Sequence, residues 1–234
     1  AAPVAGPATA PGTAPATAQA RLTAAAPLRR AAPQGGLVVL AVGVSDYARK
    51  DYDLKLAAKD ATDFAALLRS QQGRLYTRVE QRVLTDRQAT RAAVLQGLEW
   101  LRQSVGPGDT AMLFLAGHGL NDAGGRYHFL THDADADRLA RTAVSEIELR
   151  RQLAGIRGKV LLFVDTCHAG NVIGSGQQAS QEIARLANAL SSSESGVIVF
   201  SASTGRQESF EQGRWGNGAF TRALIDGLRG GADF

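Results

Sequence analysis

The stretch LVVLAVGV, residues Leu37 to Val44, is an uninterrupted apolar run that begins where the composition of the chain changes. A short run without polar residues is typical of a β-strand that is buried on both faces, as the strands of parallel sheets are. Residues 1–36, before the run, consist mainly of Ala, Pro, Thr and Gly. Such a segment cannot bury enough apolar surface to offset its ordering entropy, so we expect a disordered linker or pro-segment.

Four further apolar runs follow, and amphipathic helical patterns lie between them. The expected strands are Val79–Leu84, Thr110–Ala116, Lys159–Val164 and Gly196–Phe200, the expected helices are Lys59–Gln71, Gln88–Gln103, Ser145–Leu153, Gln181–Leu190 and Gly218–Leu228, and a hairpin is expected at Tyr127–Thr131. Asp86 stands where it could cap the helix that begins at Gln88. Strands that alternate with helices predict an α/β fold for residues 37–234: a three-layer sandwich with a mainly parallel central sheet and helices on both faces.

Two of the expected strands end in residues whose side chains could take part in catalysis. One continues as LAGHGL, with His118 between two glycines, and another as VDTCHAG, with Cys167 two residues after Asp165. Cys167 is the only cysteine of the chain, so a disulfide framework within the chain is excluded. Since catalytic groups gather at the carboxyl ends of parallel strands, His118 and Cys167 are expected to face each other if these two strands are neighbours.

A cysteine beside a histidine suggests nucleophilic catalysis. A free thiol is only slightly ionised at neutral pH, and an imidazole can accept its proton to give an activated nucleophile. The backbone amides of Gly119 and Cys167 are the expected donors of an oxyanion hole. Either residue alone would be read as a small buried side chain or a turn residue, but their combination favours a nucleophile. We assign no catalytic role to His168, because neighbouring residues of a strand point in opposite directions.

The GHG and DTCHAG motifs resemble the catalytic signatures of caspase-like cysteine peptidases, above all those of metacaspases and bacterial caspase homologues. The separation of about 50 residues between histidine and cysteine is the one that caspases have. LAVGVSDY, LKLAAKDATDF, FSASTGRQES and GNGAFTRALIDGL resemble further segments of the family. The resemblance covers Leu37 to Phe234. It implies a caspase-like sandwich and a cysteine endopeptidase with a dyad of His118 and Cys167.

The same resemblance implies which side chains bind the substrate. The cysteine lies in DTCHAG and not in the QACRG-like context of animal caspases. As in metacaspases, Asp165 and Asp60 would then line the S1 pocket, with Ser201 at its wall. Two carboxylates attract a cation, and bidentate pairing favours Arg over Lys at P1. The plainer alternatives, a turn acid for Asp165 and a helix-start acid for Asp60, remain open.

The expected partners are protein or peptide substrates with a basic P1 residue. The formal net charge is +4, but the arginines are scattered and form no block interleaved with aromatic residues, so no nucleic-acid partner is expected. No apolar run approaches the ~20 residues that span a bilayer. No cofactor is required by this chemistry. Some metacaspases bind calcium, and four acids offer oxygen ligands for it, although a solvated acidic loop is favoured: Asp133, Asp135, Asp137 and Glu146.

The chain begins at Ala1 without methionine, so we expect a fragment or a processed form, clipped at its C-terminus relative to the family. Bacterial relatives join such domains to sensor modules, which implies a fused or associated sensor domain here. The alternative to an active peptidase is a catalytically silent caspase-like interaction or scaffold module. The intact His118, Cys167 and glycines argue against that alternative.

Overall fold

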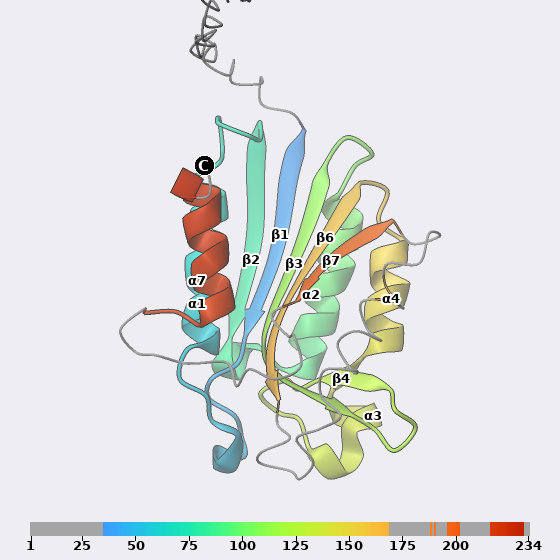
Figure 1. The fold of residues 1–234 in the computed structure, drawn as a ribbon. Coiled ribbons are helices and arrows are strands. Elements are labelled where there is room, and N and C mark those ends of the chain that lie inside the picture. The colour runs from blue at the N-terminus through green and yellow to red at the C-terminus, as the bar shows by residue number, and fades with distance from the viewer. Residues whose placement is uncertain (1–34, 169–187, 189, 191–195, 202–215, 232–234) are drawn as a thin grey trace, which may run out of the picture. The chain divides into compact units, whose positions relative to one another are not determined.

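The computed structural model describes residues 35–168, 188, 190, 196–201 and 216–231 (Figure 1). The linker expected before residue 35 and most of the helix expected over Gln181–Leu190 lie outside these residues.

A seven-stranded, mainly parallel sheet forms the centre of the described part of the chain. Its strands are β1 (Gly36–Gly43), β2 (Arg78–Thr85), β3 (Thr110–Asn121), β4 (Tyr127–Phe129), β5 (Val144–Ser145), β6 (Lys159–His168) and β7 (Val197–Ser201). On one edge, β3 pairs first with β1 and then, beyond the end of β1, with the antiparallel β4. On its other edge, β3 pairs with β6, which pairs in turn with β7. The expected strands are therefore confirmed, and the two that carry the histidine and the cysteine are neighbours.

Helices cover both faces of the sheet (Figure 1). One face carries α1 (Ala57–Arg69) and α7 (Ala219–Asp226), and the other carries α2 (Arg91–Ser104) and α4 (Glu146–Ala154). Shorter turns of helix are η1 (Lys50–Tyr52), η2 (Asp86–Gln88), η3 (Ala136–Arg138), α3 (Leu139–Thr142) and the π-helical turn η5 (Gly227–Gly231). The three-layer α/β sandwich that the sequence predicts is thus confirmed.

The apolar side chains of β1 pack into two hydrophobic cores, one on each face of the sheet. Leu37, Val39 and Ala41 pack into the core beneath α1. The alternating residues Val38, Leu40 and Val42 pack into the core on the α2 side. Successive side chains of a strand point to opposite faces, so a strand between two helical layers must be apolar at every position. This requirement explains why the run contains no polar residue.

The start of α2 differs from the sequence expectation. The helix begins at Arg91, and its N-cap is Thr90, whose hydroxyl accepts from the Ala93 amide at 3.3 Å. Asp86 does not cap it. Its carboxylate accepts instead from the amides of Ser45 and Asp46, both at 2.8 Å, in the loop after β1. Thr and Asp are both good N-cap residues, so composition alone did not distinguish them.

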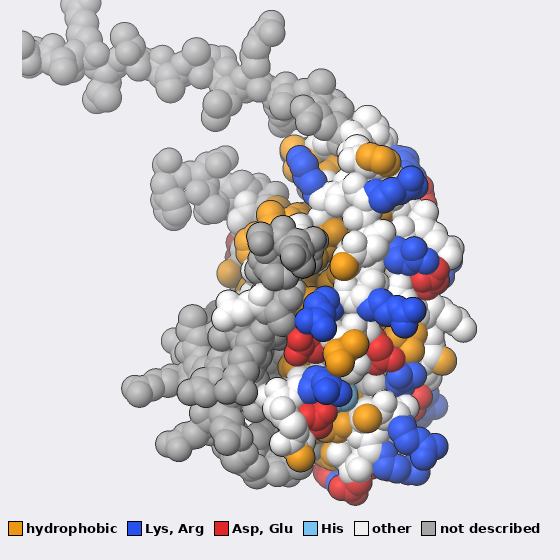
Figure 2. All heavy atoms as spheres, turned by 90° about the vertical axis from the view of Figure 1, so that its right-hand side faces the viewer, with side chains coloured by type: hydrophobic (Ala, Val, Ile, Leu, Met, Phe, Trp, Pro, Cys, Tyr) orange, Lys and Arg blue, Asp and Glu red, His pale blue; other side chains and the backbone are white. Residues whose placement is uncertain are grey.

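Basic side chains are dispersed over the side of the molecule on which α4 lies. Figure 2 shows Lys and Arg interspersed there with acidic and apolar side chains. None of the helices in the described residues is long and apolar enough to cross a membrane.

Gly43 lies where β1 meets α1, and we predict that a larger residue there destabilises the fold. A Cβ atom at this position would collide with the Ala57 carbonyl oxygen and lie 2.8 Å from the Ala61 Cβ. Both neighbours belong to a packed helix and cannot rotate away. Gly43→Ala should therefore lower the free energy of unfolding by about 1–3 kcal/mol, as overpacking generally does, in urea denaturation.

Gly108→Ala is the matched control, because nothing lies within 4 Å of the Cβ it would gain. Equal stability of the two variants would contradict the predicted collision.

Candidate active site

The backbone register of β3 and β6 brings the expected histidine and cysteine together. Ala116 is paired with Asp165, Gly117 with Thr166, and His118 with Cys167. Both strands extend further than their apolar runs, so His118 and Cys167 lie within paired strand and not in loops beyond it. The side chains of Cys167 and His168 lie outside the described part of the structure.

The His118 side chain is buried, with 3% of its surface exposed. Its Nε2 lies 2.9 Å from the carbonyl oxygen of Tyr52. A carbonyl oxygen only accepts hydrogen bonds, so Nε2 carries a proton and donates it. In a neutral imidazole the other ring nitrogen is then an acceptor. The tautomer that this contact selects makes Nδ1 the nitrogen that accepts a hydrogen bond or a proton.

Two tyrosines surround the imidazole. The Tyr47 ring lies 5.3 Å from it between centroids at a tilt of 36°, and the Tyr52 ring lies at 6.2 Å, nearly edge-on. The His118 backbone amide donates to the Tyr47 hydroxyl at 2.9 Å. Both tyrosines are almost fully buried. They fix the ring and the backbone of His118 from the side opposite to β6.

The loop after β1 holds these tyrosines in place through side chain-to-backbone hydrogen bonds. Asp86 accepts from two of its amides, as described above, and Asp53 accepts from the Tyr47 amide at 2.8 Å. The Ser45 hydroxyl accepts from the Ala58 amide at 2.9 Å, which ties the loop to the first turn of α1. Asp86 therefore does not cap α2 but holds the loop whose tyrosines pack around His118.

The glycines beside His118 are required by tyrosine side chains. A Cβ at Gly117, where φ is +151°, would lie 2.8 Å from the Tyr47 hydroxyl, and one at Gly119 would lie 2.5 Å from the Tyr127 ring. The His118 carbonyl accepts from the Leu130 amide on the β4 edge. The His118 carbonyl and the Gly119 N–H belong to one trans peptide group and point in opposite directions, so the Gly119 amide is directed to the β6 edge, where Cys167 lies.

Asp60 and Asp165 lie next to each other, although 105 positions of chain separate them, because α1 packs over the sheet. Asp60 belongs to the first turn of α1, and Asp165 lies on β6. A Cβ added at Gly218 would lie 2.9 Å from Oδ2 of Asp60 and 3.5 Å from Oδ2 of Asp165. Asp60 is 3% exposed and Asp165 8% exposed. The structure thus brings together the two acids that the resemblance assigns to S1.

The first turn of α7 supplies hydrogen-bond donors to both acids. The Asn217 amide nitrogen donates to Asp60 Oδ1 at 2.8 Å, and the Gly218 backbone N–H lies 3.2 Å from both Asp60 oxygens. The Thr221 hydroxyl donates to Asp165 Oδ2 at 2.8 Å. These donors were missed from the sequence. Their only signal was the segment GNGAFT, which carried part of the family resemblance but no assigned role.

Burial is the main cause that raises the pKa of Asp60 from 3.8 to about 6; the nearby Asp165 carboxylate acts in the same direction, and the hydrogen bonds from Asn217 and Gly218 act against it. Desolvation penalises the charged form of an acid, and neutral donors offset that penalty only in part. Asp60 forms no ion pair with any residue that the structure describes. The negative charge of ionised Asp60 is therefore not neutralised by an ion pair within the described residues.

In the part of the chain that the structure describes, Ser201 makes no contact with the acid pair through a hydrogen bond, and two of the four acids considered for calcium are engaged by other groups. Ser201 ends β7 opposite Val164, one residue before Asp165, and it makes no hydrogen bond to either acid among the described residues. Asp133 accepts from the Arg91 amide and the Thr131 hydroxyl, and Asp135 pairs with Arg138. Within the described ranges no group of three or more His, Cys, Asp or Glu side chains could hold a metal ion.

The arrangement defines an α/β sandwich in which a histidine and a cysteine are paired on adjacent parallel strands. The family model of the caspase domain matches residues 37–233. The chain belongs to the caspase-domain family, and its fold is that of the caspase-like cysteine peptidases.

Two solved structures are similar to this chain to different degrees, and the first of them shares its fold. Protein GSU0716 from Geobacter sulfurreducens superimposes with a TM-score of 0.59 at 23% identity, over 86% of this chain and 83% of that one. The Drosophila initiator caspase Dronc gives a TM-score of 0.42 at 15% identity, over 57% of this chain and 54% of that one. No curated protein matches the sequence.

The raised pKa of Asp60 predicts a pH dependence of stability. The folded state prefers the protonated acid, so the stabilisation is present in full below pH 4 and is lost as the pH rises through about 6. A shift of this size corresponds to about 3 kcal/mol. Asn cannot titrate, so the stability of the wild type relative to Asp60→Asn should fall by about that amount between pH 4 and pH 7.

Urea denaturation of both proteins across this range measures the difference, in which the contributions of titrating groups that do not interact with Asp60 cancel. A difference that stays constant, or rises with pH, would show that burial does not dominate at Asp60.

Proposed function

We propose that this chain is a cysteine endopeptidase in which Cys167 is the nucleophile and His118 the general base. The observation that carries the proposal is the pairing of His118 with Cys167, together with the Tyr52 carbonyl that holds the proton on Nε2. Residues paired across neighbouring strands share a face of the sheet, and Nδ1 of His118 is the acceptor that a thiol requires.

The reaction follows from these positions. Nδ1 of His118 takes the proton of the Cys167 thiol, and the thiolate attacks the carbonyl carbon of the scissile bond. The amides of Gly119 and Cys167 stabilise the resulting oxyanion. The imidazolium, which the Tyr52 carbonyl also stabilises, then gives its proton to the leaving amine, and an acyl-enzyme remains. Water hydrolyses this thioester with His118 again acting as base, which restores the thiol.

We propose that the S1 pocket is built on Asp165 and Asp60 and prefers Arg, then Lys, at P1. Two adjacent buried carboxylates, one of them with a raised pKa, favour a cation more than they favour any neutral group. A guanidinium can pair with carboxylate in a bidentate manner, whereas an ammonium offers a point charge. Ser201 would then contribute to the wall of this pocket from the end of β7. The resemblance to metacaspases supports the same preference.

A catalytically silent module remains the second candidate, because caspase-like folds can serve as interaction domains. The hydrogen bond between His118 and Tyr52 favours the active enzyme, since a scaffold does not need a selected imidazole tautomer. A silent module would hydrolyse no peptide, whatever residue stood at P1.

The proposal predicts that matched peptides differing only at P1 are cleaved in the order Arg, Lys, Asp, and that His118→Ala and Cys167→Ala abolish the cleavage. Asp165→Asn should reduce kcat/KM for the Arg peptide by about 10- to 100-fold, the cost of losing one charge-assisted contact. Steady-state kinetics measures both. Faster cleavage of the Asp peptide would overturn the S1 assignment, and absence of any cleavage would favour the silent module.

The position of His118 gives a second prediction. Tyr47→Phe removes the hydroxyl that accepts from the His118 amide but keeps the packed ring. Since small displacements of a catalytic group cost rate and not binding, kcat should fall about 10-fold or more while KM changes little.

Tyr76→Phe is the matched control, because Tyr76 lies before β2, at the opposite end of the sheet from His118. Equal kcat values for the two variants would show that the Tyr47 hydroxyl does not position the base.

A further inference from the structure

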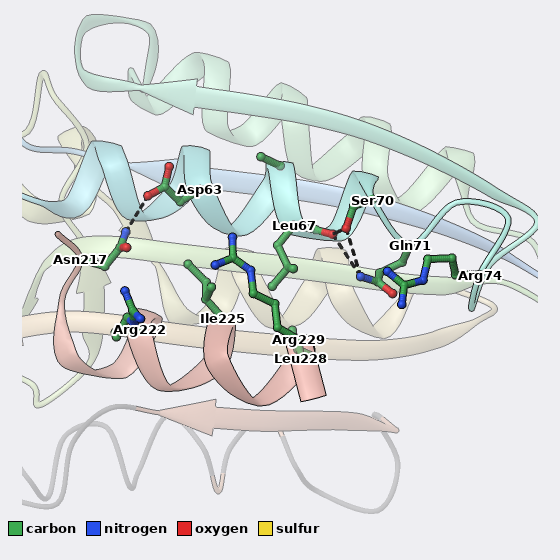
Figure 3. Close-up of a pocket in the computed structure, with 11 residues that line it drawn as sticks. Asp63, Leu67, Ser70, Gln71, Arg74, Asn217, Arg222, Ile225, Leu228 and Arg229 are labelled. Carbon is green, nitrogen blue, oxygen red and sulfur yellow. Dashed lines mark hydrogen bonds between the residues drawn. The ribbon is translucent and has the colours of Figure 1, made fainter. Parts of the chain in front are cut away.

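A cavity of about 540 Å³ lies between α1 and α7, outside the acid pair. Its lining includes apolar side chains of both helices, Ala66 and Leu67 of α1 and Ile225 and Leu228 on the α7 side, and Figure 3 shows Leu67 and Ile225 directed into the space between the helices. Leu228 is 43% exposed, although it is a large apolar side chain. Volumes of this size are typical of sites for small organic ligands.

The polar lining of the cavity is predominantly basic. Three guanidinium groups, those of Arg74, Arg222 and Arg229, and one carboxylate, that of Asp63, line it. Arg222 pairs with Asp226 on its own helix, and Asp63 pairs with Lys59. In the described part of the chain, Arg74 and Arg229 have no ion pair. Among the described residues these two guanidinium groups therefore have no ion-pair partner, although Arg229 interacts electrostatically with Asp63.

We propose that this cavity is a binding site for a small organic phosphate, a phosphomonoester with an apolar or aromatic body. A phosphomonoester carries about −1.5 to −2 charges at neutral pH, which matches two unpaired guanidinium groups. Guanidinium pairs with phosphate through parallel hydrogen bonds. The apolar side chains of the lining would contact the organic part, and Figure 3 shows Arg229 beside Leu67 and Ile225, where both parts of such a ligand could be reached.

The N-terminal segment of the chain is a poor occupant. Residues 1–34 contain three arginines and neither Asp nor Glu, so their charge opposes binding at a basic cavity. A ligand from outside the chain is the complementary one.

Occupancy would also act on the acid pair, an extension that rests on the proposed function. Asn217 lines the cavity, and its amide nitrogen donates at 2.8 Å both to Asp63 and to Asp60. A phosphate that contacted both Arg74, in the loop after α1, and Arg229, after α7, would tie the two helices together. Since the first turn of α7 positions Asp60 and Asp165, a tied α7 should lower the KM for a P1-Arg substrate.

Binding can be tested on the intact protein without any activity. Isothermal titration calorimetry with adenosine monophosphate, adenosine and inorganic phosphate separates the contributions of the two ligand parts. Saturable one-to-one binding of the monophosphate, weaker binding of phosphate and none of adenosine support the site. The affinity should fall as salt is raised. No binding of the monophosphate at millimolar concentration, or equal binding of adenosine, overturns it.

Arg74→Gln and Arg229→Gln should each weaken monophosphate binding by about tenfold or more, which is the scale of one charged hydrogen-bonding contact. Both side chains are exposed, so the variants should fold, and circular dichroism checks this. Arg150→Gln, an exposed arginine of α4 on the other face of the sheet, is the matched control. Equal weakening in all three variants would show nonspecific ion binding and overturn the site.

The coupling is tested by the KM of the P1-Arg peptide with and without saturating monophosphate. A lower KM in the wild type that is lost in Arg229→Gln supports it, and an unchanged KM with proven binding overturns the coupling alone. If no peptide is cleaved, the proposed function fails, while the calorimetric result for the cavity stands by itself.

Discussion

The in-register pairing of β3 with β6, unbroken from Thr110–Lys159 to Gly119–His168, is the constraint on which the rest of the site depends. It places Cys167 beside His118 and Asp165 beside Ala116, so one ladder of backbone hydrogen bonds aligns both the expected nucleophile and one acid. A shift of one residue would move every side chain of β6 to the other face of the sheet. The buried apolar residues of both strands forbid that shift, because each face packs against its own helical layer. The hydrophobic cores therefore fix the positions of the polar groups at the ends of the strands.

Much of this arrangement could be predicted from the sequence, for a physical reason. The strands are buried on both faces, and the requirement for apolar residues at every position makes them visible as runs such as that of β1. The C-terminal ends of the strands were predicted less well, because β3 and β6 continue through His118 and Cys167 after the apolar pattern stops. Pairing persists there because β4 takes over the edge of β3 that β1 leaves. The error at Asp86 has a similar origin: its partners are two amides 40 and 41 positions away, and local pattern carries no record of such contacts.

The donors to the acid pair were beyond sequence reasoning. Asn217 binds Asp60 across 157 positions, and Thr221 binds Asp165 across 56. Amide and hydroxyl side chains occur throughout the chain, and nothing in their residue type marks these two as buried. What could be read was the presence of two acids in family-like segments. The sequence did not reveal how the two acids are stabilised. The start of α7 brings three neutral hydrogen-bond donors and the positive end of a helix dipole to them.

The burial of these two acids has a free-energy cost that bears on function. Two buried carboxylates in proximity oppose folding, and neutral donors reduce their cost without removing it, as the raised pKa of Asp60 shows. A fold selected for stability alone would replace one of them with a neutral residue or pair it with a buried cation. Local arrangements that sacrifice stability are typical of functional sites, where the missing partner is supplied by a ligand. In the proposed function, a basic side chain of a substrate would supply that charge and lower the electrostatic cost of ionised Asp60. The raised pKa of Asp60 thus supports the proposal of a cationic ligand more directly than the mere presence of two acids does.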